Sequence, residues 1–145
     1  MKQSDVAFQK CISPRCGATF DLRDTLVACG KCGDLLDIAY DWNRLRPPGA
    51  LRDFERMWSQ RHELHRFSGV WRFRELLPFA AADEVVSVGE GQTWLQPADA
   101  VGTYVGMDPG RLFLQYEGMN PSGSFKDNGM TAAFTHARMV GATRA

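Results

Sequence analysis

The pattern of apolar and polar residues in the last third of the chain predicts a strand, a turn and a helix in succession. Residues 111–116 form an apolar run that favours a strand, and a cluster of turn formers follows at residues 120–123. Ser124 and Asp127 then have the spacing of a capping box, with Ser124 as the N-cap residue. Apolar residues at helical spacing follow, and a glycine should stop the helix: Met130, Ala133, Phe134, Ala137, Val140 and then Gly141.

The middle of the chain shows weaker patterns. Residues 35–40 resemble a strand, and a helix should start near Pro48 and bury a stripe made of Leu51, Phe54, Met57 and Trp58. The β-branched residues 85–88 predict a short strand that leads into a glycine turn at residues 89–93. The polar link at residues 99–108 is expected to be a hairpin formed by Val101 with Tyr104 and Val105.

Composition and charge narrow the functional class. The 145 residues are 44% hydrophobic and 23% charged, with a formal net charge of zero, which is typical of a soluble globular protein and implies no strong attraction to nucleic acid or to a membrane. Residues 41–78 hold eight arginines against five acidic residues. A solvated helix face with ion pairs explains this excess better than a nucleic-acid surface does. There is no apolar signal region at the start, so a cytoplasmic location is expected.

The four cysteines of the chain all fall within its first 32 residues. They are Cys11, Cys16, Cys29 and Cys32, and the second and the fourth are each followed by glycine. Two pairs brought together by a hairpin would complete a closed tetrahedral thiolate site, which favours structural zinc. The alternative is four free thiols in a reducing compartment. His62 and His65 lie three residues apart without a further ligand nearby, so we interpret them as surface or packing residues.

Lys126 would occupy the second position of the predicted helix. The partial positive charge at a helix N-terminus disfavours the ammonium form of a lysine, and a readily neutralised amine can act as a nucleophile. Taken alone, such a lysine is more often an ordinary exposed residue of the first turn. The residues around it therefore decide between the two interpretations.

Three segments resemble the threonine synthase family. Residues 120–130 read Asn-Pro-Ser-Gly-Ser-Phe-Lys-Asp-Asn-Gly-Met, which is similar to that family's N-P-T-G-S-F-K-D-R-G segment. Residues 69–78 resemble its W-R-Y-R-E-L-L-P segment, and residues 89–93 resemble the G-E-G-x-T turn. Two departures are visible, because Asn128 stands where the family usually has arginine and Trp94 where it has proline.

The resemblance implies a pyridoxal phosphate (PLP) enzyme, a lyase of threonine biosynthesis. Its reaction would convert O-phosphohomoserine and water to threonine and phosphate. Lys126 would carry the cofactor and act catalytically, and Phe125 and Ser124 would contribute to cofactor binding. Some members of the family also have a short N-terminal zinc ribbon, in agreement with the cysteine spacing.

The implied fold is α/β. We expect a zinc ribbon at residues 1–40, a linker and helical segment at 41–78, and the beginning of a PLP fold type II domain, similar to the tryptophan synthase β subunit, at 79–145. The family's phosphate-binding loop lies further downstream than residue 145. We therefore expect a truncated chain that is inactive alone and exposes the apolar stripe of its last helix.

Two other classes of function stay open. The first is another fold type II enzyme, such as a threonine or serine dehydratase or a cysteate synthase. The second is a non-enzymatic binding module built on the zinc ribbon, although residues 11–33 hold three basic and two acidic residues and so no marked basic excess. The expected partner is a small amino-acid substrate, with neither nucleic acid nor membrane, and a homodimer is possible at full length.

Overall fold

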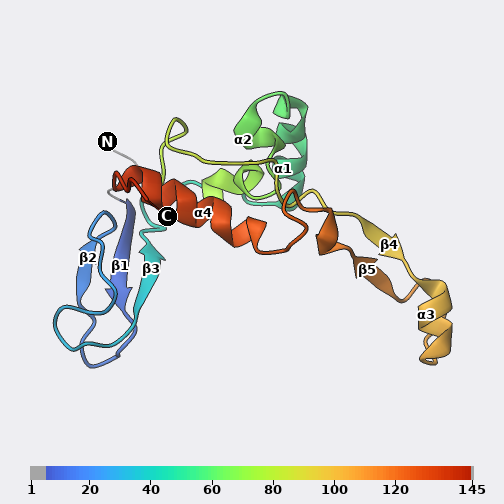
Figure 1. The fold of residues 1–145 in the computed structure, drawn as a ribbon, viewed down its shortest axis with the longest axis horizontal. Coiled ribbons are helices and arrows are strands. Elements are labelled where there is room, and N and C mark those ends of the chain that lie inside the picture. Colours follow the sequence, from blue (N-terminus) through green and yellow to red (C-terminus); the bar gives the residue numbers. More distant parts are fainter. Residues whose placement is uncertain (1–5, 145) are drawn as a thin grey trace.

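The computed structural model describes residues 6–144, and the chain begins with a small antiparallel sheet (Figure 1). Its strands are β1 (Ala7–Cys11), β2 (Thr19–Asp21) and β3 (Leu36–Tyr40), in the order β2-β1-β3. β1 is central and pairs Gln9 with Phe20 on one side and with Ile38 on the other. The predicted strand at residues 35–40 is thereby confirmed.

Short helices follow the sheet: α1 (Leu51–Met57), η2 (Trp58–Gln60), α2 (Leu64–Phe67) and η3 (Trp71–Leu76). The first, α1, begins three residues after Pro48, because a hydrogen bond of Ala50 and Asp53 fixes its N-terminus. The backbone N–H of Ala50 donates to the Asp53 carboxylate at 3.1 Å, which closes the first turn.

A hairpin extends away from the rest of the chain and carries a helix at its tip (Figure 1). It consists of β4 (Leu95–Pro97), α3 (Asp99–Tyr104) and β5 (Phe113–Gln115), and β4 pairs with β5. The hairpin predicted within residues 99–108 is wrong, because this segment begins with a helix. Asp99 accepts the N–H of Gly110 at 2.8 Å, and the N–H of Gly102 donates to Ala98 at 2.8 Å. These bonds close the helical turn and return the chain to β5.

The longest helix, α4 (Asp127–Met139), follows the short helix η4 (Glu117–Met119) and residues 120–126, which we call the lysine turn. It ends before Gly141, which has a φ of 70°, so the predicted glycine stop is confirmed. Its buried residues are Thr131, Thr135 and Met139. The predicted apolar stripe lies beside this face, and its large members Met130 and Phe134 remain exposed, as expected.

Residues 85–88 do not form the predicted strand. Their backbone bonds to helix side chains instead of to a second strand. The N–H of Val86 donates to Thr135 Oγ1 at 2.9 Å, and Thr131 Oγ1 donates to the Val86 carbonyl at 2.5 Å. This segment is therefore extended along α4 without sheet pairing.

One buried cluster joins the small sheet to the later part of the chain. It contains Ala7, Leu22, Trp71, Phe79, Ala80 and Met139. The first two come from the cysteine-rich region and the last from the end of α4, so the two regions share a core. Within residues 6–144, no helix is both long and apolar enough to cross a membrane.

Candidate functional site

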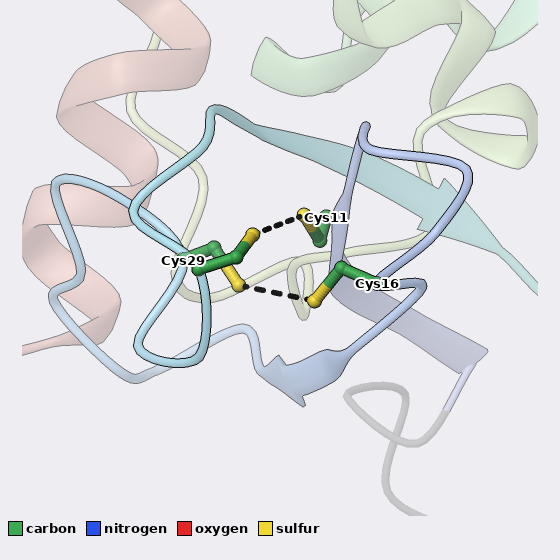
Figure 2. Close-up of side chains that lie close together, drawn as sticks. Cys11, Cys16 and Cys29 are labelled. Atoms are coloured by element: carbon green, nitrogen blue, oxygen red, sulfur yellow. Dashed lines mark hydrogen bonds between the residues drawn. The ribbon is translucent and has the colours of Figure 1, made fainter.

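The four cysteines come together at one end of the small sheet, and Figure 2 labels Cys11, Cys16 and Cys29. Cys11 is the last residue of β1, whereas the other three lie on the two turns that flank β2. All four Sγ atoms lie within 4.8 Å of one another. The closest pairs are Cys11 with Cys32 at 3.5 Å and Cys16 with Cys29 at 3.8 Å. The structure thus assembles the residues that the spacing singled out.

These sulfur separations fit a metal better than a disulfide. Four thiolates at about 2.3 Å from a tetrahedral zinc ion lie about 3.8 Å apart, whereas bonded sulfurs lie about 2.0 Å apart. The backbone N–H of Lys31 points at Cys29 Sγ, at 3.4 Å. Gly17 and Gly33, which follow the second and the fourth cysteine, have φ values of 58° and 76°. A side chain is disfavoured in that conformation, which explains the glycines of the two turns.

The thiols of this cluster titrate unequally. Burial raises the pKa of Cys11 to about 12, and its thiol neighbours add to this effect. Burial acts in the same direction on Cys29, but N–H groups of Lys31 and Cys32 outweigh it and lower the pKa of Cys29 to about 7. A cation would offset the cost of the additional thiolates, because it binds the deprotonated form.

The lysine turn connects η4 to α4 and differs from the predicted capping box. The helix begins at Asp127, so Lys126 is the N-cap residue rather than the second helical residue. The Asp127 carboxylate accepts the backbone N–H of Ser122 at 2.8 Å and also its hydroxyl, and these bonds hold the pKa of Asp127 below its ordinary value. Gly123, with a φ of 78°, turns the chain so that Ser122, and not Ser124, reaches this carboxylate. Ser124 Oγ instead accepts the N–H of Lys126 at 3.2 Å.

The predicted cofactor residues lie on the surface of this turn. Lys126 and Phe125 are exposed, and Ser124 is half-buried. Among residues 6–144, no acidic side chain lies within ion-pair distance of the Lys126 amine. The amine is therefore accessible to a ligand and is not neutralised by a carboxylate of the described chain.

Glu117 links the lysine turn to its neighbours, a role that the sequence patterns did not reveal. Its Oε2 atom accepts the side-chain amides of Asn120 at 2.8 Å and Asn128 at 3.3 Å, and its Oε1 atom accepts the Thr93 hydroxyl at 3.2 Å. Asn120 Oδ1 in turn accepts the N–H of Gly91 at 2.8 Å. The sequence signal that could have revealed this role was a glutamate close to two asparagines of the following turn and helix.

Two buried side chains attach the other family-like segments to this framework. Glu90, with no exposed surface, accepts hydrogen bonds from the hydroxyls of Ser68 and Ser87. Trp71, also fully buried, donates from Nε1 to Thr131 Oγ1 on α4 at 2.8 Å. Hydrogen bonds therefore join three segments into one unit: residues 69–78, the Gly-Glu-Gly turn at residues 89–93, and the lysine turn with its helix.

The histidines of the middle segment are not part of either site. His65 Nε2 lies 3.0 Å from the Glu63 carboxylate, within one short stretch of chain. In the described part of the chain, potential metal ligands gather only at the four cysteines.

Comparisons with known proteins give several relatives of one name. No protein-family model matches it. It is 35% identical to a threonine synthase of Methanosarcina acetivorans over 132 residues, which is 91% of this chain and 28% of the relative. A threonine synthase of Methanocaldococcus jannaschii is 35% identical over 133 residues, 92% of this chain and 29% of the relative. A threonine synthase of Synechocystis is 46% identical over 70 residues, 48% of this chain and 18% of that relative.

The first two matches include most of this chain. The first leaves 13 of the 145 residues unmatched, and the second leaves 12. The cysteine-rich and lysine-turn regions cannot both lie outside them. The chain spans less than a third of the length of these relatives. Over nine tenths of its own length, this chain is therefore related to the threonine synthases.

Proposed function

We propose that this chain forms part of a PLP-dependent threonine synthase, with Lys126 as the residue that binds the cofactor. The observation that carries the proposal is the lysine turn. It has the family's residue order, presents an accessible amine at the start of α4, and is tied by Glu117 and Asn120 to the Gly-Glu-Gly turn. Each relative reported above bears the name threonine synthase, which favours this reaction over the dehydratase and cysteate synthase alternatives.

The residues present fit one end of the cofactor. The Lys126 amine is exposed and unpaired within residues 6–144, as covalent attachment to an aldehyde requires, and Phe125 and Ser124 lie directly beside it. When bound, PLP supplies an electron sink for the charge that develops on the substrate's α-carbon. Residues that would hold the phosphate and the pyridine nitrogen are expected in the remainder of a PLP fold type II domain, which the proposal includes.

In the proposed reaction, O-phosphohomoserine and water give threonine and phosphate. Lys126 would take a proton from the substrate's α-carbon and return protons to carbon, because its amine is a base when neutral. Ser122 and Asp127 would orient the lysine by fixing the turn, since they bond to each other across it. Thr93, Asn120 and Asn128 would hold that turn in place through Glu117.

The cysteine cluster would bind one structural zinc ion. The fit rests on four sulfurs at separations expected for tetrahedral coordination, since four thiolates supply all the ligands of such a site. Such a site stabilises a fold rather than taking part in the reaction. We also propose that the full-length enzyme is cytoplasmic and that it forms a homodimer.

A chimaera tests the proposed function. This chain would replace the matched 132 residues of the Methanosarcina acetivorans relative, and phosphate release and threonine formation from O-phosphohomoserine would be measured. We expect activity in the chimaera, a loss of more than about a hundredfold in Lys126→Ala, and little change in Lys10→Ala, an exposed lysine of β1. A folded chimaera without threonine formation, or one that survives Lys126→Ala, would contradict the proposal.

A further inference from the structure

Residues 22–24 contact α4, the helix that begins after the lysine turn. Residues 22–24 follow β2 and lie between Cys16 and Cys29 in the sequence. Figure 1 shows the end of α4 next to the small sheet. The Leu22 side chain is buried in one cluster with Met139, the last residue of α4.

Two polar contacts attach this segment to the end of the helix. His136 Nε2 donates to the carbonyl of Leu22 at 2.8 Å, and a carbonyl can only accept. Arg23 donates to the carbonyl of Met139 and forms an ion pair with Glu84 at 2.8 Å. A guanidinium at the C-terminus of a helix also interacts favourably with the helix dipole.

On its other side, the segment is fixed to the sheet that carries the cysteines. The amide of Gln9 donates to the carbonyls of Asp21 and Asp24, at 2.7 Å each. Gln9 is buried and lies on β1 two residues before Cys11. The position of residues 22–24 therefore depends on the same strand that ends at the metal site.

An apolar groove of about 650 Å³ lies between the sheet and the helix, and Leu22, Asp24 and His136 of the contacts described above also line it. Ile38 and Tyr40 line it from β3, and Ala133 and Ala137 line it from α4. Because this groove lies between the two elements, the contacts of residues 22–24 are well placed to transmit order from one element to the other.

We propose that residues 22–24 couple metal binding at the four cysteines to the order of α4, with Arg23 as the main positioning residue. Closure of the cysteine site fixes the chain between Cys16 and Cys29, which holds Arg23 against the end of the helix. The helix is 13 residues long, so its other end, at Lys126, lies about 20 Å away. This inference rests on the proposed zinc site but not on the proposed reaction.

Hydrogen exchange on the full chain, with zinc and after chelation, tests the coupling. We expect zinc to slow exchange of the amides in the last two turns of α4 by at least about tenfold, a factor typical of a hydrogen bond to a charged group. Arg23→Ala should reduce this gain to less than about threefold. Glu84→Gln, which keeps the Arg23 bond to Met139, should have a smaller effect. Arg15→Ala, at an exposed arginine of the same region, is the matched control and should behave as the wild type.

Zinc content per chain, measured in the same samples, separates the possible failures. One zinc in every variant, with a gain that Arg23→Ala abolishes, supports the coupling. One zinc with no change in α4, or an unchanged gain in Arg23→Ala, would overturn it and leave the metal site intact. A wild-type chain that binds no zinc would overturn both the metal site and the coupling.

Discussion

The sheet of β1 to β3 and the arm of residues 93–116 are both built on antiparallel strands, but they differ in what covers their side chains. In β1, Ala7, Gln9 and Cys11 are buried. Every residue of β4 and β5 is exposed. The cysteine turns and the end of α4 pack against the first sheet, whereas no other element within residues 6–144 packs against the arm in this way.

The two sides of the arm are both apolar. By the alternation of a strand pair, Leu95 and Phe113 lie on one side, and Leu114 lies on the other. Apolar side chains on both faces are typical of strands that are covered on both faces in a larger sheet. The side chains of the cysteine region are therefore covered by other described residues, including the end of α4, whereas those of the arm are not.

Metal removal should give the largest difference between the two regions. Structural zinc sites contribute apparent binding free energies of about 10–16 kcal/mol, so chelation should abolish the slow amide exchange of β1 and β3. Exchange in β4 and β5 should stay as it was, because the arm makes no contact with the cysteines. Slow exchange in β1 that persists after complete chelation would contradict a metal-dependent sheet.

Trp71 and Trp94 should differ in how much each stabilises the fold. Trp71 is fully buried and bonds to Thr131, so Trp71→Ala should reduce the free energy of unfolding by about 3–5 kcal/mol. Trp94, at the base of the arm, is 63% exposed, and Trp94→Ala should cost less than about 1 kcal/mol. Urea unfolding of both variants measures the two values. Equal costs would show that the arm is already packed.

The apolar surface of the arm should bind a hydrophobic dye. We expect strong dye fluorescence from the wild-type chain, reduced by on the order of half in the double variant Leu95→Lys with Phe113→Lys. The control is Ile12→Lys with Val27→Lys, two exposed apolar positions in the cysteine region. No dye binding by the wild type, or an equal loss in the control, would contradict the contrast between the regions.

The smallest effect is expected at Asn128. Its amide donates to Glu117 where the family usually has arginine, so the contact to the carboxylate is already made without a charge. In the chimaera, Asn128→Arg should change the rate of threonine formation by less than about tenfold, or about 1.4 kcal/mol in the barrier. A gain of several hundredfold would mean that asparagine had redirected the site.

The sequence was most informative where a residue type has few uses. Cysteine spacing predicted the cluster, and the glycine at residue 141 predicted the end of α4, because thiolates and left-handed backbone are restricted to particular residues. Strand β3 was equally predictable from its own composition. None of these features depends on distant parts of the chain.

The features that could not be predicted depend on tertiary contacts. The extended segment at residues 85–88 bonds to threonines about 45 residues away, and nothing in its own composition indicates that. The prediction of Ser124 as the cap of α4 was wrong, because two serines lie close to Asp127 in the sequence. The conformation of Gly123 places Ser122 against the Asp127 carboxylate. Arg23 acts through Met139 and Glu84, which lie far from it in the sequence and which a local pattern does not contain.

The lysine that binds the cofactor can be identified directly by chemical trapping. The PLP-loaded chimaera would be reduced with borohydride and digested, and the peptide that carries the phosphopyridoxyl group would be identified by mass spectrometry. We expect this group on Lys126 and expect it to disappear in Lys126→Ala. Its recovery on Lys2, Lys10, Lys31 or a lysine of the relative's own segment would contradict the assignment of the lysine turn.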